Sequence, residues 1–145
     1  MRDLPRQLSV EELADLFEGR TRFVERLAQL EDPLGRAREV AASLSDEEKK
    51  EVLDAHPAIG AKTLSPRSAA EQGADEAPEL AELNRAYETH FGFRFVVFVN
   101  RRPKSELVPV LRERLERTRG QELATALDEL VSIAQDRWRR SRGAA

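Results

Sequence analysis

Apolar residues recur every three or four positions through most of the chain, which is the spacing that places them on one face of an α-helix. Four such segments fill the first 55 residues, and each begins at a residue suited to a helix start. These residues are Ser9, Thr21, Asp32 and Ser45. Ser9 and Ser45 are each followed three residues later by Glu, which is the capping-box pattern. The helix that follows Ser45 is predicted to end at about Ala55, because Pro57 disfavours helical backbone at His56.

The second half of the chain continues the helical pattern in longer segments. Three helices are expected, at about residues 78–91, 104–118 and 121–140, and Gly92 is placed to end the first of them. The most apolar run, Phe93 to Val99, is rich in residues that favour strands but has no evident strand partner. We interpret it as a buried connector or a short helix. The pattern therefore predicts an all-α fold, a compact single-domain bundle of about seven to nine helices over residues 1–145.

Composition narrows the class of protein. The 145 residues include no cysteine, which excludes disulfides, thiolate nucleophiles and Cys-based zinc sites. No apolar run approaches the roughly 18 residues of a membrane span, and no signal peptide or peroxisomal address is evident, so we expect a cytoplasmic protein. From Arg101 onward, eleven Lys or Arg stand against seven Asp or Glu, but the two signs are interleaved as on a solvated helix face. We therefore expect neither nucleic acid nor a membrane as a partner.

Two positions carry candidate chemistry on their own. His56 lies between a helix end and Pro57, where a rigid loop would hold a titratable imidazole for proton transfer; the alternative is an ordinary surface histidine. Arg137 continues the apolar face of the last helix, three residues after Ala134. An inward guanidinium needs an anionic partner, which is either a protein carboxylate or an anionic substrate. The second histidine, His90, is expected on the surface near a helix end, so the two histidines do not indicate a metal site.

Four motifs follow one another through the chain at spacings typical of one family. They are His56-Pro57-Ala58-Ile59-Gly60; Ser68-x-x-Glu71-Gln72; Leu83-Asn84-x-x-Tyr87-x-x-x-Phe91-Gly92-Phe93-x-Phe95; and Glu122-Leu123-x-x-Ala126-Leu127-x-Glu129, leading to Ile133-Ala134-x-x-Arg137. Together they resemble the 2-oxo-4-hydroxy-4-carboxy-5-ureidoimidazoline (OHCU) decarboxylases of urate degradation, from about Leu8 to Arg137. The resemblance implies an all-α enzyme, usually a homodimer, that converts the small molecule OHCU to (S)-allantoin and CO₂ without a cofactor or a metal.

The resemblance also implies roles for individual residues. His56 corresponds to the proposed proton donor, and we expect Glu71 to polarise it and to raise the pKa of the imidazole. The expected substrate contacts are Pro57, Ser68, Gln72, the run Phe95, Val96, Val97, Phe98 and Val99, and Arg137. Ser68 and Glu71 also fit a capping box, so a structural role for this pair stays open. One departure from the family pattern is Arg94, where many relatives have proline.

A non-enzymatic helical module is the alternative function. It would bind a protein partner through the apolar Phe91–Val99 segment or the basic last helix, and it would account equally well for the helices and the lack of cofactor motifs. It does not account for an inward Arg137 or for a rigid His-Pro loop. A third possibility is an enzyme of the same fold that acts on a related ureido acid.

Overall fold

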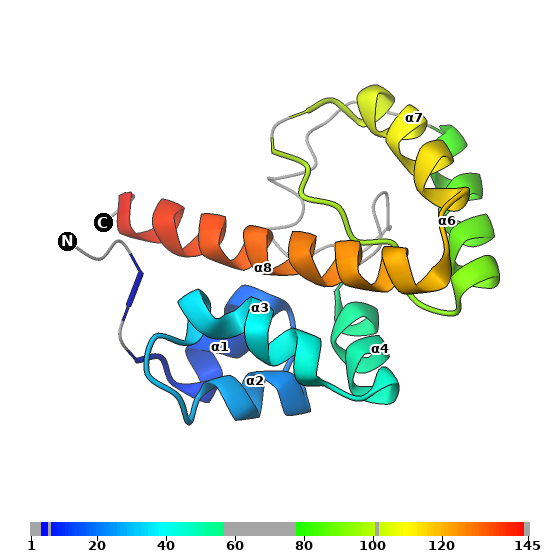
Figure 1. The fold of residues 1–145 in the computed structure, drawn as a ribbon. Coiled ribbons are helices and arrows are strands. Elements are labelled where there is room, and N and C mark those ends of the chain that lie inside the picture. Colours follow the sequence, from blue (N-terminus) through cyan, green and yellow to red (C-terminus); the bar gives the residue numbers. More distant parts are fainter. Residues whose placement is uncertain (1–3, 6, 57–77, 101, 144–145) are drawn as a thin grey trace.

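The computed structural model describes residues 4–5, 7–56, 78–100 and 102–143 (Figure 1). Within these residues it has seven α-helices and no strand, so the prediction of an all-α fold is confirmed, at the lower end of the expected number of helices. The helices are α1 (Val10–Phe17), α2 (Arg22–Leu27), α3 (Pro33–Ser43), α4 (Asp46–Ala55), α6 (Pro78–Phe91), α7 (Lys104–Leu115) and α8 (Arg119–Gly143). None of the described helices combines the length and the apolar character needed to cross a bilayer.

Helix α8 organises the fold. It runs across the molecule, with α1 to α4 on one side and α6, α7 and the segment 93–99 on the other (Figure 1). It packs against α1, α3 and α4, while α6 and α7 pack against each other. Its buried apolar residues are Leu123, Ala126, Leu127, Leu130, Val131, Ile133 and Ala134. They repeat at intervals of three and four residues, so one continuous stripe of a single helix joins the two parts of the molecule.

Capping boxes begin two of the helices where the sequence predicted them. The Glu12 N–H donates to the Ser9 hydroxyl at 3.1 Å, and the Ser9 N–H donates to the Glu12 carboxylate at 3.0 Å. Ser45 and Glu48 form the same pair of bonds at 3.2 and 3.0 Å. Asp32 precedes α3 as expected, but its backbone is left-handed, with φ of 54°, and its side chain makes no capping hydrogen bond. The start of α3 therefore depends on the proline that follows rather than on a carboxylate cap.

The boundary between α7 and α8 differs from the prediction. Helix α7 ends at Leu115 and α8 begins at Arg119, whereas the apolar spacing indicated about 118 and 121. The Gln121 N–H donates to the Thr118 hydroxyl, and the Thr118 N–H donates to the Gln121 side-chain oxygen, both at 3.1 Å. Thr-x-x-Gln is a form of the capping box, and it begins α8 two residues earlier than the apolar spacing alone indicates.

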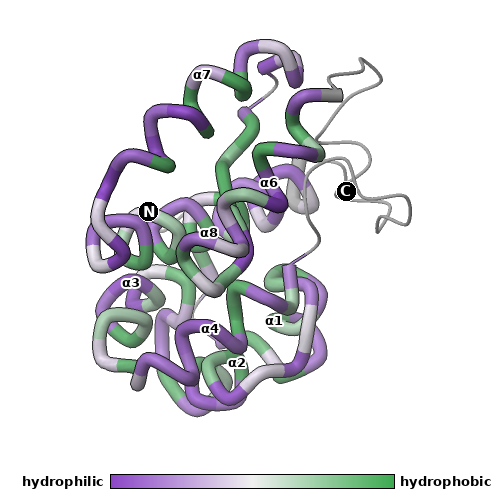
Figure 2. The backbone as a smooth tube through the Cα atoms, turned by 90° about the vertical axis from the view of Figure 1, so that its right-hand side faces the viewer, coloured by the Kyte–Doolittle hydropathy of each residue, from purple (hydrophilic) through white to green (hydrophobic). Residues whose placement is uncertain are grey.

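The segment between α6 and α7 is extended and belongs to neither a strand nor a helix. It is the hydrophobic stretch that leads from α6 toward α7 in Figure 2. The buried residues of this segment are Phe93, Phe95, Val96, Val97 and Val99, while Phe98 is partly exposed. Helix α6 ends before Gly92, whose φ of 82° is the left-handed conformation predicted for a residue that follows a helix. The interpretation of residues 93–99 as a buried connector is confirmed.

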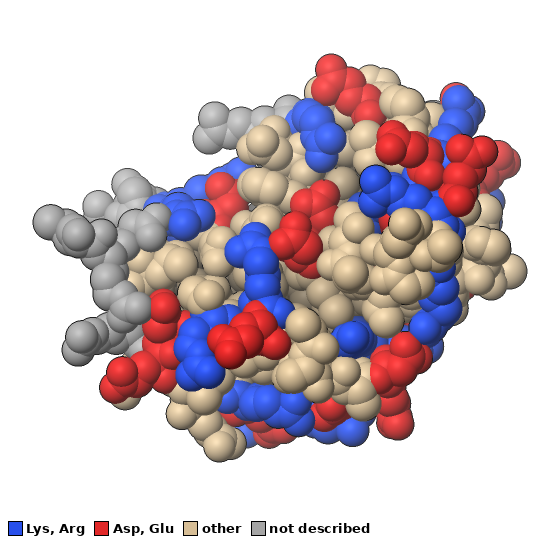
Figure 3. Space-filling view, in the orientation of Figure 1, with Lys and Arg blue, Asp and Glu red and all other residues tan. Residues whose placement is uncertain are grey.

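Charged side chains are mixed on the surface, as the interleaved sequence predicts. Figure 3 shows Lys and Arg beside Asp and Glu over most of the face that it presents. Arg119 donates to both carboxylate oxygens of Asp46, at 2.8 and 3.1 Å, which ties the start of α8 to the start of α4. The visible face therefore lacks the single-sign patch that marks a nucleic-acid-binding surface.

Candidate functional site

His56 lies at the end of α4, in the position that the sequence predicted. Its backbone is extended, with φ of −80° and ψ of 135°, which is the conformation favoured before a proline. Its N–H donates to the Leu53 carbonyl at 3.2 Å. The residue is only 8% exposed, so the alternative of an ordinary surface histidine is wrong. Its ring atom Nδ1 has no hydrogen-bond partner among the described residues and is therefore available to another group.

The surroundings of His56 disfavour its protonated form. Burial, followed by the positive charges of Arg137 and Arg94, lowers its pKa to about 3. This direction is opposite to the increase that the sequence analysis expected from Glu71, a residue outside the described part of the chain. The described residues thus hold the imidazole neutral at pH 7. They also bring it near two guanidinium groups, which makes the surroundings of His56 attractive to an anion.

Arg137 points inward from α8, as the apolar spacing predicted, and is 1% exposed. Its Nη1 donates to the Leu16 carbonyl at 2.9 Å and lies 3.2 Å from the Glu18 carboxylate. Glu18 ends α1 in a left-handed conformation, with φ of 65°, directly before Gly19. The protein carboxylate left open by the sequence analysis is therefore present. The positive charge of Arg137 still contributes to the lowered pKa of His56, so Arg137 keeps an electrostatic effect on the site despite its ion pair with Glu18.

Side chains anchor the extended segment that follows Arg94. Arg114 donates to the Val96 carbonyl at 2.9 Å. Arg102 donates to the carbonyls of Phe98 and Val99, at 2.7 and 3.0 Å. The Phe98 N–H binds Glu129, whose pKa is nevertheless raised because the carboxyl is partly buried. These bonds replace the ladder of a sheet, so the backbone of residues 95–99 is fixed by side chains from α7, α8 and the loop before α7.

A buried polar cluster of Tyr87, Arg114 and Glu122 contacts this segment through Arg114. The Tyr87 hydroxyl donates to Glu122 Oε1 at 2.6 Å, and Arg114 Nε donates to the same oxygen at 2.7 Å. The Arg114 guanidinium also lies 4.6 Å from the centre of the Phe95 ring. Burial and the bond to Glu122 raise the pKa of Tyr87.

Arg114 was not among the residues predicted to be buried, although its spacing in the sequence indicates burial. Arg114 falls three residues after Leu111 and seven after Leu107, both of which are buried in α7. This is the spacing that revealed Arg137 on α8. Arg94 and Glu129 gave no such signal, because their contacts reach across 40 and 31 residues of chain.

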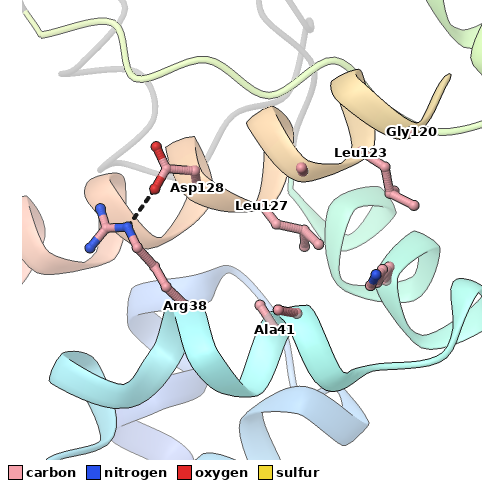
Figure 4. Close-up of a pocket in the computed structure, with 9 residues that line it drawn as sticks. Arg38, Ala41, Gly120, Leu123, Leu127 and Asp128 are labelled. Atoms are coloured by element: carbon pink, nitrogen blue, oxygen red, sulfur yellow. Dashed lines mark hydrogen bonds and ion pairs between the residues drawn. The ribbon is translucent and has the colours of Figure 1, made fainter. Parts of the chain in front are cut away.

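A pocket of about 390 Å³ lies elsewhere, between α3, α4 and the beginning of α8 (Figure 4). It is lined by Arg38, Ala41, Ala42, Lys49, Gly120, Leu123, Ala124, Leu127 and Asp128. Arg38 binds Asp128 across its edge and donates to the Ser132 hydroxyl at 2.8 Å. None of the residues predicted to act in the site lines this pocket. Over the described ranges, no three His, Asp or Glu side chains are grouped as metal ligands.

Comparison with known proteins places the chain in a family. The family model described as OHCU decarboxylase matches residues 2–139. The chain belongs to the OHCU decarboxylase family. It is 32% identical over 100 residues to the 2-oxo-4-hydroxy-4-carboxy-5-ureidoimidazoline decarboxylase of Haloferax volcanii, a match covering 63% of this chain and 60% of that protein. It is 34% identical over 104 residues to a putative decarboxylase of the same name from Homo sapiens, with the same two coverages.

A solved structure confirms the similarity in fold. The crystal structure of an OHCU decarboxylase in the presence of (S)-allantoin matches 89% of this chain and 96% of that chain, with a TM-score of 0.74 and 24% identity. The curated relatives are longer than the matched region. Matches to the Haloferax volcanii protein, to the uric acid degradation bifunctional protein of a Bacillus species and to the Halalkalicoccus jeotgali protein cover 60%, 22% and 56% of their respective lengths.

The motif residues of the OHCU decarboxylase family fall into two groups in this structure. His56, Arg137 and the segment Phe95, Val96, Val97, Phe98 and Val99 are described, and Arg94 joins the start of that segment to the end of α4. Pro57, Ser68, Glu71 and Gln72 lie outside the described residues, as does the choice between a capping and a substrate-binding role for Ser68 and Glu71.

Proposed function

We propose that the chain catalyses the cofactor-independent decarboxylation of OHCU to (S)-allantoin and CO₂ in urate degradation. One observation carries the proposal: at the family motif lies a buried histidine with an unpartnered ring nitrogen, whose pKa is lowered by the positive charges of Arg137 and Arg94 as well as by burial. A carboxylate substrate needs positive charge to bind, and the ring carbon next to the one that loses CO₂ must afterwards be supplied with a proton on one side of the ring. Membership of the OHCU decarboxylase family supports the same reaction.

The substrate supplies its own electron sink in this proposal. Carbon 4 carries the carboxylate and a hydroxyl and adjoins the ring C=N bond at carbon 5. When the bond to the carboxylate breaks, its electron pair forms a C4=C5 double bond, and the former C=N pair moves to the ring nitrogen, which takes a proton. The 4-hydroxyl then loses its proton to become the carbonyl of allantoin, while carbon 5 gains a proton. No electron leaves the substrate in any step.

His56 is the group proposed to deliver the proton to carbon 5. Its imidazole is neutral at pH 7 in the surroundings described above, with a pKa of about 3. An anionic substrate placed between it and Arg137 offsets the positive field, so binding itself raises the pKa of His56. We propose that Glu71 adds to this increase and fixes the tautomer. A positioned proton donor of this kind contributes roughly 10²–10⁴ in rate.

The remaining proposed roles concern binding. We propose that Arg137 orients the substrate carboxylate or a ring carbonyl, with a charge-assisted hydrogen bond. Pro57 would line the pocket, and Ser68 and Gln72 would bind the ureido and ring amides. The backbone of residues 95–99 would complete the site, since side-chain anchors leave this segment extended rather than paired in a sheet. A homodimer in the cytoplasm remains our proposal for the assembled protein, and light scattering in solution tests the dimer.

The alternative of a helical interaction module loses one of its two proposed docking surfaces, the apolar segment. Phe91, Phe93 and Phe95 are at most 3% exposed and pack around Tyr87, with ring centres 4.6 to 5.8 Å from the Tyr87 ring. The apolar segment that would bind a partner is therefore part of the core, because aromatic side chains buried in this way stabilise the monomer itself.

The experiment follows the optical activity of freshly prepared OHCU with and without the purified protein. The proposal predicts faster loss of OHCU and accumulation of (S)-allantoin, whereas water, which protonates either side equally, gives a racemic product. Unchanged decay and a racemic product would refute it. A related ureido acid as the true substrate would be indicated by slow turnover of OHCU together with faster turnover of that acid.

A further inference from the structure

Arg94 joins the two parts of the site that the proposed function uses. Its Nη1 donates to the carbonyl of His56 at 2.8 Å and to that of Asp54 at 3.2 Å. Its backbone N–H donates to the Asp54 carboxylate at 3.0 Å, and its Nε lies 3.4 Å from Glu88 on α6. We call this set of contacts, Arg94 with Asp54, His56 and Glu88, the Arg94 clamp.

The clamp satisfies two backbone carbonyls at the end of α4. The last carbonyls of an α-helix lack partners within the helix, and many helices solve this with N–H groups from the residues that follow. After α4 the next residue but one is Pro57, which has no N–H to donate. The guanidinium of Arg94 supplies the donors instead. Lys50 pairs with Asp54 one turn earlier in α4, so the acceptor side of the clamp is itself held in place.

The clamp also fixes one part of the site relative to another. Arg94 directly precedes the segment 95–99, and its side chain donates to the carbonyl of His56. This hydrogen bond restrains the backbone of His56, and therefore the direction in which its imidazole points. Movement of His56 relative to the segment would therefore require the hydrogen bonds of Arg94 to break.

We propose that Arg94 is a positioning residue, which fixes the imidazole of His56 relative to the substrate-binding backbone of residues 95–99 by holding the end of α4. This inference rests on the proposed function, because it assigns importance to the place of His56. Arg94 does not act on the reacting atoms in this account. A proton donor displaced by about 1 Å can lose on the order of 10²-fold in rate, so the effect should appear in kcat more than in KM.

The experiment compares Arg94→Gln and Arg94→Lys with the unaltered protein and with Arg36→Gln, which removes an exposed arginine of α3 that pairs with Glu39 one turn further along the helix. Lysine keeps the positive charge but lacks the planar guanidinium, whose Nη1 donates to the two carbonyls while its Nε contacts Glu88. We expect kcat to fall by about 10- to 100-fold in Arg94→Gln and by less in Arg94→Lys. KM should change by less than about threefold in both, and Arg36→Gln should match the unaltered protein. The temperature of each assay is kept well below the melting temperature of each variant.

A second measurement separates this inference from the proposed function. The chain has only two histidines, so the ring signals of His56 can be assigned by comparison with His90→Gln in NMR spectra. Arg94→Lys keeps the charge, so a shift of the His56 ring signals in that variant reports a change of position. The inference is overturned if these signals or kcat stay unchanged in the folded variants. If the unaltered protein proves inactive on OHCU, the proposed function fails and the NMR signals alone decide whether Arg94 positions His56.

Discussion

Replacement of Arg114 by methionine should lower the free energy of unfolding by about 3 kcal/mol, near the lower end of the roughly 3–5 kcal/mol that a broken buried ion pair costs. The Arg114 and Glu122 side chains are 5% and 0% exposed and lie 2.7 Å apart. Methionine fills much of the same volume but leaves the Glu122 charge in the core. Two groups keep the loss from being larger, since the Tyr87 hydroxyl still donates to Glu122 and Arg117 remains 3.8 Å from its second oxygen.

Urea denaturation followed by circular dichroism measures this loss, since a change of midpoint at constant slope is a change of stability. Arg112→Met is the matched control, because Arg112 belongs to the same helix but pairs with Glu79 at the surface, where such a pair is worth at most about 1 kcal/mol. The double variant Arg114→Met/Glu122→Gln removes the stranded charge and should recover at least about 1 kcal/mol of the loss. A loss below about 1 kcal/mol for Arg114→Met, or no recovery in the double variant, would refute the reasoning.

Three further predictions concern other parts of the molecule. The pKa of His56 is about 3 in the folded protein against 6.5 for a free histidine, so the unfolded chain takes up the proton first as the pH falls. The free energy of unfolding should therefore decrease from about pH 6.5 toward pH 3, by up to about 1.4 kcal/mol per pH unit. The urea midpoint of His56→Gln should change less with pH over this range than that of the unaltered protein. The midpoint of the exposed His90→Gln should keep the pH dependence of the unaltered protein. Gly92→Ala should lower the free energy of unfolding by about 1–2 kcal/mol because φ is 82°, although an added Cβ meets no atom within 4 Å. Gly120→Ala, with equal space inside α8, should raise it by up to about 1 kcal/mol. Shifts of the melting temperature in the same direction for both variants would contradict this. Ser45→Ala should cost about 1 kcal/mol in the same assay, because the helix loses the hydroxyl that caps it, and an unchanged melting temperature would contradict that role.

Local interactions explain why the helices were predictable. A capping box such as Ser45 with Glu48 is complete within four residues, and the extended backbone of His56 follows directly from the proline after it. Where a second local signal competed with apolar spacing, as at Thr118 and Gln121, the hydrogen bonds decided the boundary. These features need no knowledge of the remainder of the chain.

The candidate site was predictable only in part, because its electrostatics depend on distant residues. The spacing on α8 placed Arg137 inside, but it did not identify Glu18, 119 residues earlier, as the carboxylate beside it. The sequence suggested a raised pKa for His56 from one acidic neighbour. The lowered value results from burial and from two arginines on other elements, a balance that only a three-dimensional arrangement reveals.

The role of His56 is tested most directly by the stereochemistry of the product formed by His56→Gln. Glutamine has a similar polar side chain but cannot supply a titratable proton, so the substrate should still bind while carbon 5 is protonated from water. The account predicts that the unaltered protein gives predominantly (S)-allantoin, and that His56→Gln gives a nearly racemic product at a rate lower by at least about 10²-fold. Predominantly (S)-allantoin formed by His56→Gln at the normal rate would contradict the assignment of His56 as the proton donor.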